Sequence, residues 1–170
     1  MQIKSEYNKV IPRKYPEQVV ISVVKDGEGK YNPITLGWTM ITSHNPPMMA
    51  IAVAHNHHSR KAIEESREFV IAFPSSAMAK AALFFGTKSG RDMEKLKEHP
   101  VATEPAREVD SLLLSDAVAN FECKLESQLD TGDHMLYVGR IIASHVNTDA
   151  TLQRVFTIAP GYKMGAVEGV

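Results

Sequence analysis

The amino-acid sequence predicts a mainly β fold, a closed or nearly closed β-barrel with peripheral helices. Residues 117–128 and 134–146 form two long β segments on either side of the turn sequence Asp-Thr-Gly-Asp at 130–133, which predicts a long antiparallel pair. Apolar and polar residues alternate through the first of these segments, as expected for a strand. Short strands and few helices accompany this pair, and that combination favours a barrel over a parallel α/β sheet.

Four shorter strands are predicted before the long pair. Residues 19–24 (VVISVV) are rich in β-branched residues and end at a Lys-Asp-Gly turn signal, which predicts a strand entering a hairpin. A second strand is predicted over 35–42. The sequence Asn-Pro-Pro at 45–47 breaks the chain before a buried strand over 48–53, and FVIAF at 69–73 predicts another strand.

Three helices are predicted around these strands. Ser59 is the expected N-cap of a helix over residues 60–67, because a serine hydroxyl at that position satisfies a free backbone N–H group. Small residues over 77–85 suit a closely packed helix that Gly86 ends. The polar stretch 87–100 is expected to hold another short helix.

Length and composition indicate one domain over residues 1–170. The chain is 44% hydrophobic and 23% charged, which is typical of a globular protein. It is also long enough to bury a sizeable core. Nineteen Lys and Arg against twenty Asp and Glu give a net charge of -1, which excludes the basic surface of a nucleic-acid binder.

The expected location is the cytoplasm. The single cysteine, Cys123, has no partner for an internal disulfide, which favours a reducing compartment. The N-terminal sequence MQIKSEYNKV has no apolar run of the kind found in signal peptides. The longest mostly apolar stretch, residues 48–54, is too short to cross a bilayer, so no membrane contact is expected.

A basic segment, HNHHSRK at 55–61, follows a buried strand and opens the first helix. The unpaired N–H groups of a helix N-terminus attract phosphate, and side chains here add a hydroxyl and positive charge. The candidate anion-binding residues of this segment are His57, His58, Ser59, Arg60 and Lys61. The alternative is a capped helix with a solvated basic turn.

A glycine-flanked loop, GTKSGRD at 86–92, is a second candidate. Such a loop can wrap an anion through its backbone N–H groups and its cations, which makes Lys88, Ser89 and Arg91 candidate ligands. The loop lacks the GxxxxGK[ST] spacing of a nucleotide P-loop. A helix cap followed by an ordinary turn is the alternative interpretation.

The sequence Gly-Asp-His at 132–134 marks the entry to the last long strand. Histidine titrates near neutral pH, so His134 is a candidate to donate a hydrogen bond to a ligand or to shuttle a proton, with Asp133 beside it. The alternative is a hairpin turn that carries an exposed histidine.

Other chemistries have less support. His55, His57 and His58 have no Cys or carboxylate at zinc-like spacing around them, so no metal site is expected. Cys123 lies among the inward-facing apolar residues of its strand and is expected in the core. The sequence contains neither GxSxG nor GxGxxG, which leaves hydrolase and Rossmann folds without support.

An ordered series of segments resembles the flavin reductase-like family, which includes flavoredoxins and the small reductase components of two-component monooxygenases. The series is PEQVVISVV, NPITLGWTMITSHNPPMMAIAV, HHSRKAIEESREFVIAFP, FGTKSGRDMEK, NFECKL and GDHMLYVGRI, and it spans about residues 15–146. The resemblance implies a split β-barrel that binds FMN at a homodimer interface. It also implies NAD(P)H as co-substrate, with the flavin carrying the hydride chemistry.

The same resemblance implies roles for individual residues. Those that match the strand and turn holding the isoalloxazine ring are Trp38, Thr39, Met40, Ile41, Thr42 and Ser43. Those that match positions near the flavin phosphate, or the SGRD-like loop beside the flavin, are His57, His58, Ser59, Lys88, Ser89 and Arg91. Asp133 and His134 match a Gly-Asp-His motif near the flavin and the nicotinamide.

The chain departs from the family pattern at several positions. His57 and His58 replace a common Arg–Tyr pair, which should weaken a phosphate contact at high pH because histidine is mostly neutral above its pKa. Ala72 stands where Asn is frequent, and Phe85 stands where some members have Cys. The second change argues against a flavin-adjacent cysteine.

Two functions therefore remain open. The first is an oxidoreductase that transfers hydride from NAD(P)H to flavin, with free flavin, ferric iron or a redox protein as the final acceptor. The second is a flavoredoxin-like FMN electron carrier without a nicotinamide site, whose partner is another redox protein. The intact Gly-Asp-His sequence at 132–134 favours the enzyme.

Overall fold

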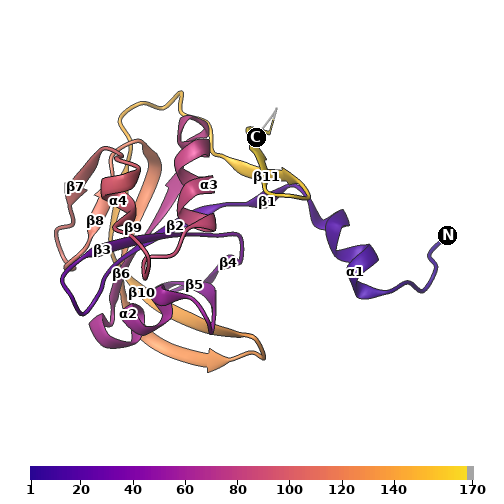
Figure 1. The fold of residues 1–170 in the computed structure, drawn as a ribbon, viewed down its shortest axis with the longest axis horizontal. Helices are drawn as coiled ribbons and strands as arrows, with labels where there is room; N and C mark the ends of the chain where they lie inside the picture. The colour runs from indigo at the N-terminus through magenta and orange to yellow at the C-terminus, as the bar shows by residue number, and fades with distance from the viewer. Residues whose placement is uncertain (168–170) are drawn as a thin grey trace.

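The structure, a computed structural model, describes residues 1–167. Its centre is a seven-stranded antiparallel sheet in the order β3-β2-β6-β9-β10-β5-β4 (Figure 1). The strands of this sheet are β2 (Val20–Lys25), β3 (Tyr31–Leu36), β4 (Thr39–His44), β5 (Pro47–Ala54), β6 (Glu68–Pro74), β9 (Ala117–Asp130) and β10 (His134–Val146). In the described chain the edge strands β3 and β4 are not paired with each other. The sheet is therefore a split barrel, and the predicted mainly β fold is confirmed.

Short helices and two small sheets surround the barrel. The helices are α1 (Tyr7–Val10), α2 (His58–Ser66), α3 (Ala79–Thr87) and α4 (Lys95–Glu98), with 3₁₀ turns at Ile11–Lys14 and Ser76–Met78. The small sheets are β1 (Glu17–Gln18) with β11 (Phe156–Ala159) and β12 (Lys163–Gly165), and β7 (Thr103–Pro105) with β8 (Leu112–Leu114). The segment that carries α1 projects away from the barrel (Figure 1).

Two hydrophobic cores lie on opposite faces of the sheet. Val20 belongs to the core inside the barrel, where Ile63 of α2 is also buried. Ile21, the next residue of β2, belongs to the outer core, where Phe85 of α3 is buried. Because both faces of β2 are covered, residues 20–24 are all buried and are apolar except for Ser22, instead of alternating between apolar and polar. Helices α2 and α3 thus contribute apolar side chains to the two cores that bury the opposite faces of β2.

One predicted strand is wrong. Residues 35–42 were expected to form a single strand, but β3 ends at Leu36 and β4 begins at Thr39. Gly37 and Trp38 lie between them, and the two strands occupy opposite edges of the sheet. The chain must therefore cross the barrel opening at this point, which a short β-prone sequence does not reveal. The crossing brings Trp38 to the mouth of the pocket described below.

Two predicted helix ends also need correction. Helix α2 begins at His58, and His57 is its N-cap, so Ser59 lies inside the first turn. The Ser59 hydroxyl is buried and accepts a hydrogen bond from Asn32 Nδ2 at 2.7 Å, which ties α2 to β3. Helix α3 passes through Gly86 and ends at Thr87.

The other expected elements are confirmed. The strands predicted over 19–24, 48–53 and 69–73, the long antiparallel pair and the short helix within 87–100 are all present. Cys123 is fully buried, and burial raises the pKa of its thiol to about 12, as expected for a core residue. None of the helices in residues 1–167 is long and apolar enough to span a membrane.

Candidate functional site

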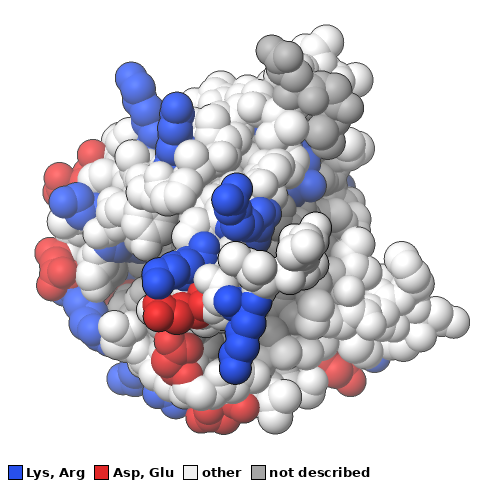
Figure 2. Space-filling model, turned by 90° about the vertical axis from the view of Figure 1, so that its right-hand side faces the viewer, with Lys and Arg blue, Asp and Glu red and all other residues white. Residues whose placement is uncertain are grey.

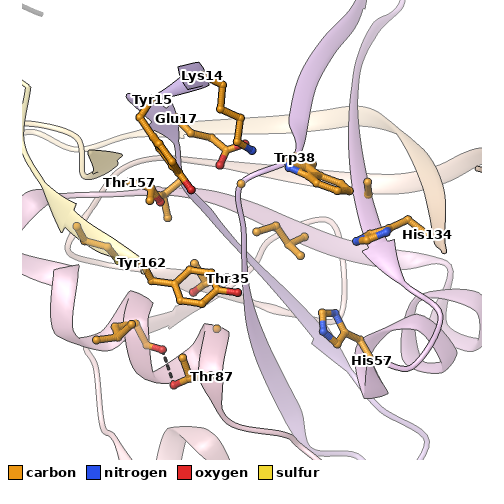
Figure 3. A pocket seen from close by; sticks show the side chains of 17 residues that line it. Lys14, Tyr15, Glu17, Thr35, Trp38, His57, Thr87, His134, Thr157 and Tyr162 are labelled. Atoms are coloured by element: carbon orange, nitrogen blue, oxygen red, sulfur yellow. Dashed lines mark hydrogen bonds and ion pairs between the residues drawn. The ribbon is translucent and has the colours of Figure 1, made fainter. Parts of the chain in front are cut away.

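A pocket of about 350 Å³ opens between the barrel and the small sheet formed by β1, β11 and β12. Figure 3 shows Trp38 and His134 on one side of it, and Tyr15 and Tyr162 on the other. The floor includes Thr35 of β3, together with Gly86 and Thr87 at the end of α3. Aromatic walls around a space of this size suit a planar ligand.

Trp38 and His134 form a pair on one wall. Their ring centroids are 4.5 Å apart with an interplanar angle of 40°. Asp133 Oδ1 lies 2.6 Å from His134 Nδ1, and this hydrogen bond lowers the pKa of the Asp133 carboxyl. An ionised carboxylate only accepts, so His134 Nδ1 carries the hydrogen and Nε2 is left to act on a ligand. Asp133 and His134 are thus hydrogen-bonded to each other, and His134 lines the pocket.

The N-terminus of α2 lies at the same pocket. No side chain of the described residues caps its first turn, so backbone N–H groups remain free to meet an anion. His57, the N-cap residue, lines the pocket. Burial, and then the nearby positive charges of His134, Lys95 and Arg91, lower the pKa of His57. At neutral pH this side chain therefore offers hydrogen bonding without a full positive charge.

The loop after α3 lies beside that helix terminus. Arg91 Nη2 donates to the carbonyl of Asn56 at 2.7 Å, and the Arg91 N–H donates to Ser89 Oγ at 3.2 Å. Gly90 is packed against Asn32, because a Cβ at this position would stand 2.3 Å from Asn32 Oδ1. The two segments that the sequence singled out for anion binding are thus neighbours in space, although they lie about 30 residues apart.

Several predicted ligands point elsewhere. His58 Nε2 lies 3.3 Å from Asp26 Oδ2, at the turn between β2 and β3. Arg60 Nε is paired with Glu64 at 3.2 Å, and Lys61 Nζ is paired with Glu65 at 3.5 Å. These i, i+4 ion pairs direct both cations along α2 and away from its N-terminus. The phosphate candidates that remain are His57, Lys88, Ser89 and Arg91.

Strand β4 itself does not line the pocket, and only Trp38, the residue just before it, does. Trp38 lines the pocket, while Thr39 and Met40 line a shallower hollow of about 270 Å³ that also includes Trp38. The Thr39 hydroxyl donates to the carbonyl of Ala50 at 2.8 Å. The rest of the predicted ring-binding stretch, Ile41, Thr42 and Ser43, lines neither of these two hollows.

The opposite wall was missed by the sequence analysis. It is built from residues close to the two ends of the chain, namely Lys14, Tyr15, Glu17, Thr157, Tyr162 and Met164. Glu17 and Thr157 are register partners in the β1–β11 pair, and Lys14 forms an ion pair with Glu17. Lys14 Nζ also lies 5.5 Å from the centroid of the Trp38 ring.

A buried lysine, Lys95, connects elements that contribute residues to the pocket floor. Lys95 Nζ donates to the carbonyls of Pro33 and Phe85 at 2.7 and 2.9 Å, and burial lowers its pKa to about 8. It joins α4 to β3 and to the end of α3. Its charge also contributes to the lowered pKa of His57.

The residues present fit a flavin. Trp38 and His134 line the pocket with their rings 4.5 Å apart, and aromatic side chains of this kind suit a planar ring system. The free N–H groups at the start of α2 and the nearby Arg91 suit a phosphate. Residues 1–167 contain no group of three or more His, Cys, Asp or Glu side chains placed to hold a metal ion.

Comparisons with known proteins agree with this geometry. The family described as flavin reductase like domain matches residues 12–159, and the chain belongs to this family. An uncharacterized protein of Pyrococcus abyssi is 33% identical over 129 residues, which cover 76% of this chain and 73% of that protein.

Two solved structures share the fold. The flavoredoxin of Methanosarcina acetivorans has a TM-score of 0.87 at 23% identity, and the match covers 100% of this chain and 93% of the other. The NADH:FAD oxidoreductase SgcE6 of Streptomyces globisporus has a TM-score of 0.81 at 18% identity, with 98% of both chains covered. The family match identifies a flavin-related redox protein, and these two structures share its fold.

Proposed function

We propose that the protein is an oxidoreductase that transfers hydride from NAD(P)H to a bound FMN and passes the electrons to an acceptor. The observation that carries this proposal is the convergence of two features on one pocket. One is the Trp38–His134 pair, oriented by Asp133. The other is the free N-terminus of α2 with Arg91 beside it. A bound flavin would supply the two-electron redox chemistry.

FMN is the proposed flavin because its terminal phosphate matches the anion site. The N–H groups at the start of α2 and Arg91 provide donors and charge for a doubly charged group, and Lys88 lies three residues before Arg91 in the same loop. Trp38 lines the pocket and would stack against the planar ring. FAD would have to place its adenylate beyond these donors, so we expect it to bind more weakly.

His134 has the proposed catalytic role. Asp133 holds the hydrogen of the imidazole on Nδ1, so Nε2 is free to accept a proton or, when protonated, to donate one. Full reduction of a bound flavin to its neutral form would require one hydride and, in addition, one proton. A histidine at the pocket wall, with 20% of its side chain exposed, can relay that proton between the ligand and water.

Anaerobic mixing of the FMN-loaded protein with NADH or NADPH tests the function. We expect the visible flavin absorbance to bleach in a single turnover, and His134→Ala to slow the bleaching by about tenfold or more while FMN affinity changes little. His99→Ala is the control, because His99 stacks on Phe84 outside the pocket. If neither nicotinamide reduces the flavin and only a partner protein does, the protein is an electron carrier like the flavoredoxins.

We also propose that the working unit is a homodimer formed through the β4 edge. Met40 and Ile41 on this strand are 54% and 61% exposed, which is unusual for large apolar side chains beside a ligand site. Figure 2 views the molecule from the side that carries the N-terminal segment. Charged side chains gather over one half of this face, and the other half of the face is largely uncharged.

Light scattering tests this assembly. We expect the wild type to have twice the mass of one chain and Ile41→Asp to have the mass of one chain, because a carboxylate in an apolar contact is left desolvated. Ile41→Leu is the control and should remain dimeric. A wild-type protein that is monomeric at every accessible concentration contradicts the proposal.

A further inference from the structure

Tyr162 stands at the rim of the pocket on a segment beyond the part of the chain that the family matches. The family match ends at residue 159, whereas Tyr162 lies at the tip of the hairpin between β11 and β12. It is 68% exposed, and it nevertheless lines the pocket. Its ring lies across the pocket from Trp38, His134 and His57 (Figure 3).

The backbone of Tyr162 is in the left-handed region, at a φ of 57°. Gly161 before it has a φ of 78°, which costs glycine nothing because it has no Cβ. For a bulky L residue the same region is unfavourable. Glycine or asparagine would suit the turn better than tyrosine. A strained residue at the edge of a ligand site points to a role for its side chain in function instead of in the fold.

The position of Tyr162 indicates which ligand it meets. A ligand that sits against the buried side of the pocket, near Thr35 and the start of α2, is surrounded by the barrel. The exposed ring of Tyr162 faces the opening, through which an exchanging substrate must enter. The π face of tyrosine attracts planar rings, and it attracts cationic rings most strongly. The nicotinamide ring is planar, and it is also positively charged in the oxidised dinucleotide, which is the product of the proposed reaction and exchanges through the same opening.

We infer that Tyr162 is a substrate-binding residue that stacks on the nicotinamide ring of the dinucleotide at the pocket mouth. This inference rests on the proposed function, because it assigns the second substrate of the same site. Tyr15 flanks the same rim from the β1 side. The flavin would then bind deeper, with Tyr162 covering the substrate that arrives after it.

The test uses Tyr162→Gly, which removes the ring and also relieves the backbone. NAD⁺ binding to the FMN-loaded protein is measured by calorimetry and by fluorescence of Trp38, the single tryptophan of the chain. We expect the Kd for NAD⁺ to rise about tenfold, the magnitude of one aromatic stacking contact. The Kd for FMN should change little, and the thermal midpoint should not fall because a left-handed residue has become glycine.

Two control variants separate loss of the stacking contact from a change in the fold. Tyr162→Phe keeps the ring face and should keep NAD⁺ affinity near that of the wild type. Within residues 1–167, Arg67 is the other non-glycine residue with a φ of 57°, at the end of α2 and outside the pocket, and Arg67→Gly should leave NAD⁺ affinity unchanged. This variant also removes the hydrogen bond that Arg67 Nη2 donates to the Leu125 carbonyl at 3.0 Å, so it controls for a glycine placed at a left-handed position away from the pocket.

The outcomes distinguish the inference from the proposed function. Unchanged NAD⁺ affinity in Tyr162→Gly, or an equal rise in the Kd values for NAD⁺ and FMN, overturns the role of Tyr162 while NAD(P)H still reduces the flavin. Weakened NAD⁺ binding in Tyr162→Gly supports the stacking contact even if the wild-type flavin is not reduced, and in that case the proposed hydride transfer is what fails.

Discussion

Replacing Glu122 with alanine is expected to lower the free energy of unfolding by about 3–5 kcal/mol, because the change breaks a buried charged network. The Glu122 carboxylate is fully buried in β9. It accepts hydrogen bonds from the backbone N–H groups of Arg107, Glu108 and Val109, and it lies 2.6 Å from His145 Nε2. Alanine would leave these donors without a partner inside the protein, where each unsatisfied group is costly.

Urea unfolding of matched variants measures this effect. Glu126→Ala is the control, since Glu126 lies on the same strand with its side chain exposed, and it should change the free energy of unfolding by less than about 0.5 kcal/mol. Equal effects of Glu122→Ala and Glu126→Ala would show that the buried network does not stabilise the fold.

The pH dependence of stability gives a second readout on Glu122. Burial alone would raise the pKa of this carboxyl, but hydrogen bonds from the Arg107 and Glu108 backbone and from His145 bring it below its usual value. A carboxyl whose pKa is lower in the folded state stabilises the protein above its unfolded pKa. This contribution disappears as the pH falls below about 4 and through the folded pKa. Glu122→Gln should therefore flatten the acid limb of the stability profile.

Glu122 also shows how far the sequence predicts the fold. The alternation in residues 117–128 correctly predicts a strand and correctly turns Cys123 and Leu125 inward. It does not reveal that the opposite face is covered as well, because that cover comes from the segment of β7 and β8 and from long-range packing. Glu122 and Asn120 are buried under this segment, although their chemistry is that of exposed strand residues.

The candidate site was predictable where it depends on local chemistry. The basic helix start and the glycine-flanked loop are both recognisable as candidate anion-binding segments, and Arg91 joins them through the carbonyl of Asn56. The directions of individual side chains were not predictable. Arg60 and Lys61 have glutamates four residues further along α2, and these attract the cations away from the helix N-terminus.

The opposite wall was not predictable from local sequence. It depends on the pairing of Glu17 in β1 with Thr157 in β11, residues at opposite ends of the chain. Two short strands of this kind have no periodicity to detect, because β1 spans only Glu17–Gln18. The tyrosine after Gly161 looks like an ordinary turn residue until the hairpin is seen above the pocket.

Replacing Arg91 with alanine is expected to weaken FMN binding by about ten- to a hundredfold, the loss of a charge-assisted hydrogen bond of about 1.5–3 kcal/mol. The guanidinium has five N–H donors, and the bond from Nη2 to Asn56 leaves others free beside the α2 N-terminus. The lowered pKa of His57 leaves Arg91 as the cation beside the α2 N-terminus that is available to a phosphate at neutral pH. Riboflavin has no phosphate, so its affinity should change little.

Calorimetric titration of both ligands separates a phosphate contact from loss of structure. Arg91→Lys keeps a positive charge and should retain part of the preference for FMN over riboflavin. Lys124→Ala is the control, because Lys124 pairs with Glu68 and does not line the pocket. If Arg91→Ala weakens both ligands equally, Arg91 acts by bracing the loop against Asn56. The phosphate would then have to lie at a different part of the pocket rim, where Lys14 supplies the positive charge.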